Sequence, residues 1–126
     1  NNYLAVSLCQ MNAEALALSQ RFGLTLETTL DVLYGTTAVN GQLKVNWPNK
    51  VLIDDTEPGF TIDLAHKDLS LIVDAANAAK VPMPLAAAAR EAFSAARAGG
   101  FGGRDFSAMV DALCHQAGIQ KPRLKR

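Results

Sequence analysis

Asp68 is the side chain in this sequence whose placement most suggests chemistry. It lies in a row with Leu64, Leu71 and Ala75, at the spacings of four and three that mark one stripe of an α-helix. The rest of the row is apolar, and a carboxylate buried there needs a hydrogen-bond or charge partner because burying a bare charge is costly. The residues alone favour a structural hydrogen bond for Asp68, with a role at a ligand site as the alternative.

A second stripe of the same expected helix is polar. It contains Asp63, Lys67, Ser70, Asp74 and Asn77, and this spacing predicts a face in contact with water. Asp63 and Lys67 stand four residues apart, in the order that favours an ion pair along a helix. The helix is therefore expected to carry one carboxylate on an apolar stripe beside a charged face.

Two further segments look functional at first sight. Asn1 and Asn2 open an apolar helix, where asparagines serve as capping residues or form the ragged end of a chain. The glycines of residues 99–103 are similar to a phosphate-binding loop, but the segment lacks the P-loop lysine and follows no expected strand. We therefore expect a hinge between two helices at residues 99–103.

Composition and charge argue against several classes of function. The 12 basic residues balance the 12 acidic ones, which disfavours nucleic-acid binding. The basic tail of residues 121–126 is expected to be a solvated, frayed terminus in preference to a phosphate contact. No apolar run approaches the roughly 18 residues of a membrane span, and two histidines, His66 and His115, do not make a metal site. Cys9 and Cys114 fall in apolar helical patterns, so we expect reduced core residues in a cytoplasmic protein.

The elements that position these residues are expected to be helices in one domain, because 126 residues, 49% of them hydrophobic, suffice for one core. The first helix carries two apolar stripes: Leu4, Leu8, Met11, Ala15, Leu18 and Phe22 on one side, and Ala5, Cys9, Ala13 and Leu16 on the other. An apolar pattern on both sides predicts a helix that is buried on several sides.

Capping residues delimit the other helices. Helix starts are expected at Thr25, Thr61, Pro84 and Asp105, and helix ends at Gly23, Gly35, Gly99 and Gly118. Residues 36–59 are irregular: a short helix over residues 37–43 is compatible with the pattern, and Trp47-Pro48-Asn49 breaks it. Residues 51–53 are expected to form a buried extended connection, because a single strand without a partner is not stable.

Residues 59–69, with the sequence GFTIDLAHKDL, are similar to a motif of the β-hydroxyacid dehydrogenase family. Other segments resemble the same family in the same order: Asn1-Asn2, residues 13–16, residues 82–84 and residues 102–108. The family includes 3-hydroxyisobutyrate dehydrogenase, tartronate semialdehyde reductase and glyoxylate/succinic semialdehyde reductases. The resemblance covers essentially the whole chain, but only the C-terminal half of the family's sequence.

The resemblance implies an all-α fold, a multi-helix domain of the 6-phosphogluconate dehydrogenase C-terminal type with a long N-terminal interdomain helix. Residues 1–126 would form the C-terminal helical substrate and dimerisation domain of a homo-oligomer, packed on a Rossmann domain. The reaction would be hydride transfer between NAD or NADP and a small β-hydroxyacid or its semialdehyde, of the 3-hydroxyisobutyrate or 2-hydroxy-3-oxopropionate type. The dinucleotide fingerprint GxGxxG is absent from these residues, so the fragment alone would be inactive.

The resemblance also implies roles for single residues. The family's catalytic lysine belongs to a K-x-x-N-N motif and would lie three residues before Asn1. Asn2 would help to hold the substrate and orient this lysine, with Asn1 as its neighbour at the substrate. Phe60 would line the substrate pocket, although a hydrophobic residue that packs before a helix cap is the alternative. Lys67 would approach the cofactor, and Asp68 would lie near the catalytic centre.

Two hypotheses from other classes stay open. One is a non-catalytic helical dimerisation or interaction module related to the family. The other is an independent helical binding protein. A lysine three residues before Asn1 in the complete gene would favour the enzyme.

Overall fold

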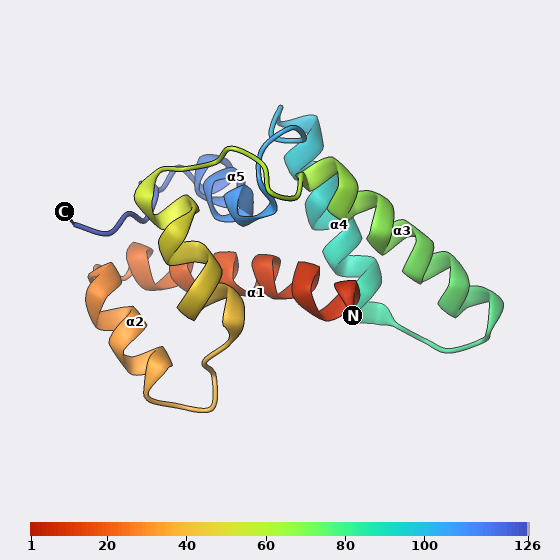
Figure 1. Ribbon diagram of the computed structural model, residues 1–126, viewed down its shortest axis with the longest axis horizontal. Coiled ribbons are helices and arrows are strands. Elements are labelled where there is room, and N and C mark those ends of the chain that lie inside the picture. The colour runs from red at the N-terminus through yellow and green to blue at the C-terminus, as the bar shows by residue number, and fades with distance from the viewer. Residues whose placement is uncertain (126) are drawn as a thin grey trace.

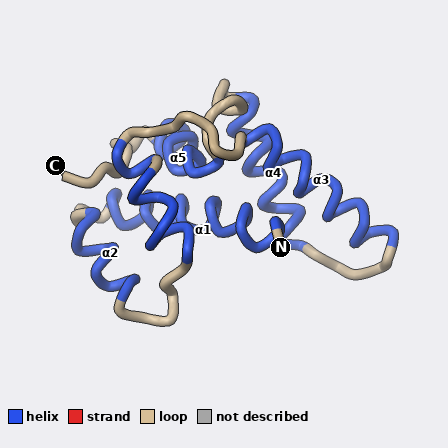
Figure 2. The backbone as a smooth tube through the Cα atoms, in the orientation of Figure 1, coloured by secondary structure: helices blue, strands red, loops and turns tan. Residues whose placement is uncertain are grey.

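The structure, a computed structural model, describes residues 1–125 and consists of helices and the turns between them (Figures 1 and 2). The helices are α1 (Asn2–Arg21), α2 (Leu26–Tyr34), α3 (Ile62–Ala78), α4 (Pro84–Ala98) and α5 (Met109–Ala117). Four short helical turns complete the list: η1 (Gln42–Asn46), η2 (Trp47–Asn49), η3 (Val51–Ile53) and η4 (Phe106–Ala108). No strand occurs within residues 1–125, which confirms the all-α class.

Helix α1 is the central element of the arrangement. It contacts α2, α3, α4 and α5, and Figure 1 shows α2 and η1 around one end of it and the α3–α4 pair at the other. The chain begins at the α3–α4 end, so the first residues of α1 lie close to α3 and α4. This placement is what brings Asn1 and Asn2 toward the motif of residues 59–69.

Local capping signals predicted most helix boundaries. The side chains of Thr25 and Thr61 accept hydrogen bonds from Thr28 N and Leu64 N and cap α2 and α3, as expected. Pro84 is the first residue of α4, where its missing N–H is not needed. Gly23 follows α1 with a φ of +83°, a conformation that favours glycine.

The prediction that α1 is buried on several sides is wrong within this chain. Its buried side contains Cys9, Ala13 and Leu16, which are at most 2% exposed. The other apolar stripe faces outward: Leu4, Met11, Leu18 and Phe22 are between 59% and 75% exposed. The residues of α1 that pack into the core lie on the side of Cys9. Within residues 1–125 the second stripe is covered only in part, with Leu8 half-buried.

The irregular segment differs from the expectation in form. Residues 37–43 do not make a helix; the helical turns begin at Gln42, and Trp47-Pro48-Asn49 itself forms η2. A short turn accepts Pro48 near its start because the missing N–H has no partner to lose there. Val51 and Leu52 are buried as expected and Ile53 is half-buried, but the three residues form the helical turn η3 and not an extended connection.

The expectation of a frayed tail is wrong for residues 121–125. Arg123 donates from Nη1 and Nη2 to the two carboxylate oxygens of Asp111, at 2.9 and 2.8 Å, and it also reaches Asp54 at 3.0 Å. The side chain of Asp111 is 1% exposed, so its charge requires such a partner. Leu124 N donates to Leu52 O at 2.8 Å. The expectation for Arg126 lies outside the described residues.

Residues 99–103 link α4 to η4, and two of them, Phe101 and Gly102, pack against neighbouring elements. Gly102 O accepts a hydrogen bond from Asp63 N at 2.9 Å, and Phe101 is 8% exposed. A side chain at Gly102 would collide with the carboxylate of Asp63. The segment that follows α4 therefore packs against the first turn of α3.

Candidate functional site

The structure joins Asn2 and Asp68, which are 66 residues apart in sequence. Asn2 Nδ2 in the first turn of α1 donates to Asp68 Oδ2 in α3 at 2.6 Å. Asn1 Nδ2 in turn donates to Asn2 Oδ1 at 3.3 Å. Because its nitrogen donates and its oxygen accepts, the Asn2 amide is held in one orientation. Three of the residues that the sequence pointed to thus form one hydrogen-bonded chain.

Asp68 lies at an edge of α3 and not on its buried side. The buried side of α3 contains Ile62, Ala65 and Leu69, each 0% exposed. Leu69 is the residue next to Asp68 in the sequence. Leu64 and Leu71, its expected apolar neighbours, are 45% and 58% exposed, so the prediction of a buried stripe around Asp68 is wrong for this chain. The Asp68 carboxylate has a hydrogen-bond partner in Asn2, and both roles considered for Asp68 are compatible with this bond.

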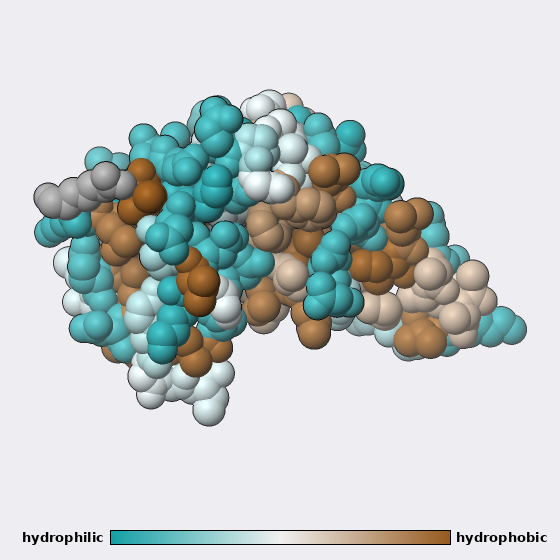
Figure 3. All heavy atoms as spheres, viewed as in Figure 1, coloured by the Kyte–Doolittle hydropathy of each residue, from teal (hydrophilic) through white to brown (hydrophobic). Residues whose placement is uncertain are grey.

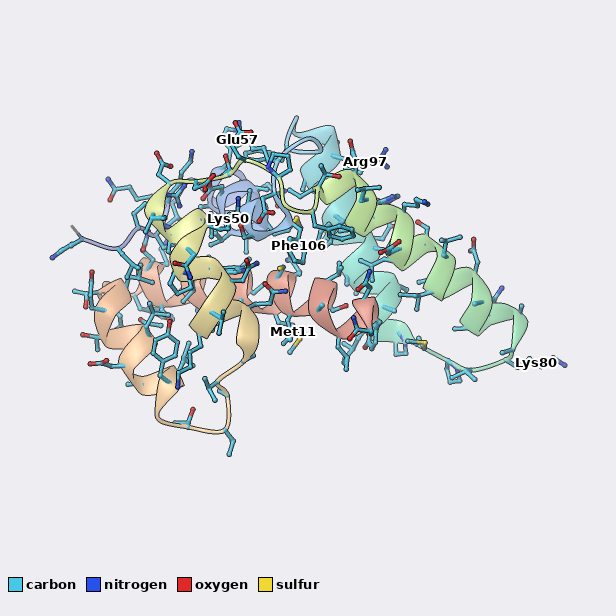
Figure 4. The ribbon with its side chains drawn as sticks, in the orientation of Figure 1. Met11, Lys50, Glu57, Lys80, Arg97 and Phe106 are labelled. Carbon is cyan, nitrogen blue, oxygen red and sulfur yellow. The ribbon has the colours of Figure 1, made fainter. Side chains whose placement is uncertain are left out.

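Phe60 belongs to the loop that enters α3, and it lines a cavity. The cavity has a volume of about 560 Å³ and lies between α1, η1 and this loop. Its walls include Ala5, Gln42, Lys50, Phe60 and Phe106, and Figure 4 labels Lys50 and Phe106 among them. Ala5, which lines the cavity, stands one helical turn after Asn2 on α1. The Phe60 ring therefore packs before the helix cap and faces a pocket at the same time.

Lys67 is not brought to the other candidate residues by any interaction within residues 1–125. Its side chain is exposed on the polar face of α3. Asp63, its expected partner, pairs instead with Arg97 of α4 at 2.7 Å. The prediction of an Asp63–Lys67 ion pair is therefore wrong, because a guanidinium from the neighbouring helix occupies the carboxylate. Lys67 is therefore an exposed residue without an ion pair within residues 1–125.

Asp105 is the residue of this site that the sequence analysis recognised only in part. It caps η4 as expected, since Oδ2 accepts from Ser107 N at 3.1 Å and from Ser107 Oγ at 2.6 Å. Its Oδ1 also accepts from Gly59 N at 3.0 Å and from Phe60 N at 3.2 Å. No periodicity or spacing signals this second contact, because the partners are more than 40 residues away along the chain.

The cysteines and the acidic residues do not form a further site. Cys9 and Cys114 are free and buried, and burial raises the pKa of both thiols. Within the part of the chain that the structure describes, no three His, Cys, Asp or Glu residues are grouped so that they could hold a metal ion. No helix among residues 1–125 is long and apolar enough to cross a membrane.

The chain is similar to known proteins over most of its length. The 3-sulfolactaldehyde reductase of Escherichia coli is 45% identical over 119 residues, which are 94% of this chain and 40% of that protein. Glyoxylate/succinic semialdehyde reductase 1 of Arabidopsis thaliana is 35% identical over 114 residues, 89% of this chain and 38% of that protein. The chain thus spans about two fifths of the length of these relatives.

A solved structure and a family model complete the comparison. The crystal structure of 3-hydroxyisobutyrate dehydrogenase from Salmonella typhimurium matches with a TM-score of 0.80 and 33% identity, over 87% of this chain and 38% of that one. Residues 1–113 match the family model described as NAD-binding of NADP-dependent 3-hydroxyisobutyrate dehydrogenase. The chain therefore belongs to the β-hydroxyacid dehydrogenase family, as its C-terminal helical domain of the 3-hydroxyisobutyrate dehydrogenase type.

Proposed function

We propose that this chain is the C-terminal substrate and dimerisation domain of an NAD(P)-dependent oxidoreductase. The complete enzyme acts on a small β-hydroxyacid or the corresponding semialdehyde, of the 3-hydroxyisobutyrate or 2-hydroxy-3-oxopropionate type. The observation that supports this most directly is the hydrogen bond from Asn2 to Asp68. It connects the two motifs of the family, Asn1-Asn2 and residues 59–69, and Phe60 of the second motif lines the cavity.

The bonding pattern of Asn2 suits a residue that orients both a lysine and a substrate. One hydrogen of its amide is committed to Asp68, and its oxygen accepts from Asn1. One amide hydrogen and one lone pair remain for other partners. In our proposal a lysine three residues before Asn1 exchanges the proton of the reacting oxygen, while Asp68 balances the charge of that lysine.

In the proposed site, Phe60 contacts the substrate and Lys67 lies toward the cofactor. Phe60 forms part of the cavity wall and would contact the carbon skeleton of the substrate. NAD or NADP, bound mainly by a Rossmann domain, would supply or accept the hydride. The exposed ammonium of Lys67 and the exposed Leu64 and Leu71 beside Asp68 fit a surface that a cofactor-carrying domain covers.

We propose a class of substrates and not one compound, because the relatives are named for different substrates. The two relatives described above are named for sulfolactaldehyde and for glyoxylate or succinic semialdehyde, and all of these compounds are small anions with a reactive carbonyl. The cavity wall contains Lys50, but its ammonium already contacts Glu57 O at 2.8 Å and Asp55 at 3.5 Å. Recognition of the anionic group is therefore assigned mainly to the Rossmann domain.

The test uses the full-length protein and a panel of semialdehydes with NADH and with NADPH. The panel contains succinic, methylmalonic and tartronic semialdehydes and 3-sulfolactaldehyde. We expect oxidation of one cofactor with at least one compound, and loss of this activity in Asn2→Ala and in the variant that lacks the upstream lysine. Absence of turnover with every compound, in a folded protein that also binds neither cofactor, would falsify the proposal.

A second candidate is a non-catalytic helical dimerisation or interaction module related to the family. The observation that favours it is the exposed stripe of α1 with Leu4, Met11, Leu18 and Phe22, which is typical of an interface. The two candidates share this surface and differ in the residue three places before Asn1. A lysine there supports the enzyme, and another residue supports the module.

A further inference from the structure

We infer that Asp105 is a positioning residue that holds Phe60 in place in the substrate pocket. This inference rests on the proposed function, since it concerns the same site. Asp105 is 2% exposed, and it lies between two segments, the loop of Gly59 and Phe60 on one side and Ser107 on the other. Neither the family motif of residues 59–69 nor a capping role accounts for the first of these contacts.

The chemistry of the four contacts explains why a carboxylate stands at this position. Oδ1 receives the two backbone N–H groups of Gly59 and Phe60, and Oδ2 receives the backbone N–H and the hydroxyl of Ser107. The three backbone groups are obligate donors, so the residue between them has to accept on both sides. Ionised carboxylates only accept, whereas a serine of the same capping ability is too short to reach both segments.

Both backbone groups of Phe60 are tied to residues 105 and 106. Phe60 N donates to Asp105 Oδ1 at 3.2 Å, and Phe60 O accepts from Phe106 N at 2.7 Å. The two rings then meet edge to face, with centroids 5.3 Å apart and an interplanar angle of 85°. Phe60 and Phe106 line the cavity together with Ala5, one turn after Asn2. A displaced Asp105 would therefore move the Phe60 ring relative to Asn2.

The test compares Asp105→Ser with Ser107→Ala in the full-length protein. Asp105→Ser keeps a capping oxygen for Ser107 N but loses the bonds to Gly59 and Phe60. Ser107→Ala loses a hydroxyl on the far side of the carboxylate and leaves the loop contacts intact. We expect amide hydrogen exchange of residues 59 and 60 to accelerate in Asp105→Ser and to stay at the wild-type rate in Ser107→Ala.

The functional arm of the test measures kcat/KM with the best substrate of the panel. Asp105→Ser is expected to lower it about 10- to 100-fold, because a displacement of about 1 Å at a reacting site costs up to about 100-fold in rate. Ser107→Ala is expected to stay within about 2-fold of wild type. In a Phe60→Ala background the effect of Asp105→Ser should fall to about 2-fold, since the two residues act through one ring. A structural role alone predicts that the two losses multiply.

The outcomes separate this inference from the proposed function. Unchanged exchange at residues 59 and 60 in Asp105→Ser overturns the inference whether or not the enzyme is active. Faster exchange with unchanged kcat/KM, or with multiplying losses in the double variant, also overturns it. A full-length protein without turnover on the whole panel contradicts the proposed function, and exchange then still decides whether Asp105 holds the loop.

Discussion

Asn2 and Asp68 show what a single hydrogen bond contributes at the scale of residues. The bond fixes the Asn2 amide and gives the Asp68 carboxylate one partner, and no further partner of Asp68 lies within residues 1–125. A half-buried carboxylate with spare acceptor capacity, close to the place where a lysine would enter, is suited to charge balance. Its structural and catalytic roles make different predictions.

The first prediction concerns Asp68→Asn in the full-length protein. The amide keeps the size of the side chain and an oxygen that accepts from Asn2, so stability should change little. Loss of the charge should lower kcat by about 30- to 1,000-fold, equivalent to about 2–4 kcal/mol of transition-state stabilisation. Turnover and melting temperature are to be measured on one preparation. A lowered melting temperature with near wild-type turnover would leave Asp68 with a structural role only.

A second prediction at this scale concerns the ion pair between Arg123 and the buried Asp111. Arg123→Met should lower the free energy of unfolding by about 3 kcal/mol, because it leaves a buried carboxylate without its main partner. Lys121, at 4.0 Å from Asp111, compensates only in part. Urea unfolding measures the loss, with Arg123→Met/Asp111→Leu as the control in which no charge is left. A loss below about 1 kcal/mol in the single variant would contradict this account.

At the scale of elements, helix α3 carries two of the candidate residues, Lys67 and Asp68, and Phe60 lies in the loop before it. Its start is defined by Thr61, whose side chain caps the first turn, and by Ile62 and Asp63, whose N–H groups donate to Arg104 O and Gly102 O at 2.9 Å. The rest of the helix packs mainly on α4. The position of Asp68 opposite Asn2 therefore depends on how α3 begins.

The third prediction tests this dependence through the two threonine caps. Thr61→Ala should lower the free energy of unfolding by about 1 kcal/mol, and Thr25→Ala in α2 by a similar amount, because each removes one capping bond. In the full-length protein, under the proposed function, only Thr61→Ala should raise the KM for the substrate, since α2 carries no residue of the candidate site. An equal effect of both variants on KM would mean that general destabilisation, and not the start of α3, governs the site.

At the scale of the whole molecule, the outer side of α1 is an exposed apolar surface among residues 1–125. Figure 4 shows Met11 pointing away from α5, and Figure 3 shows apolar side chains at the surface in the same part of the view. Leu4, Met11, Leu18 and Phe22 extend this surface along the helix. We propose that a second copy of the chain covers it in a homo-oligomer.

The fourth prediction follows from this surface. Light scattering of the chain at high concentration should give a dimer or larger species, and Leu18→Glu should shift it toward the 13.4 kDa monomer. Val32→Glu, at an exposed position of α2 outside the stripe, is the control and should leave the assembly unchanged. A wild-type monomer at high concentration would contradict the homo-oligomer.

The fifth prediction concerns residues 1–126 as an isolated domain. It should show no measurable binding of NADH or NADPH by calorimetry and no turnover of β-hydroxyacids, because neither the dinucleotide fingerprint nor the family's lysine lies within them. The charge of Lys67 is expected to give only a weak attraction to the cofactor phosphates, which added salt would screen. Binding of either cofactor in the micromolar range would show that the helical domain holds the dinucleotide by itself.

The sequence by itself determined the features that depend on near neighbours along the chain. The caps at Thr25 and Thr61, the glycine after α1 and the proline at the start of α4 act within one helical turn, so their residue types predict the boundaries. The motif of residues 59–69, together with Asn1-Asn2 and the other similar segments, likewise identified the family.

Only the tertiary structure decided the features that depend on partners far along the chain. Both stripes of α1 are apolar, and packing alone selected the side of Cys9 for burial. Arg123 forms ion pairs with Asp111 and Asp54, and Asp105 accepts a hydrogen bond from Phe60 N. The partners are too far apart in the sequence for helical periodicity to predict these contacts. Asn2 reaches Asp68 for the same reason: a hydrogen bond between two helices is set by their packing, and packing depends on the whole core.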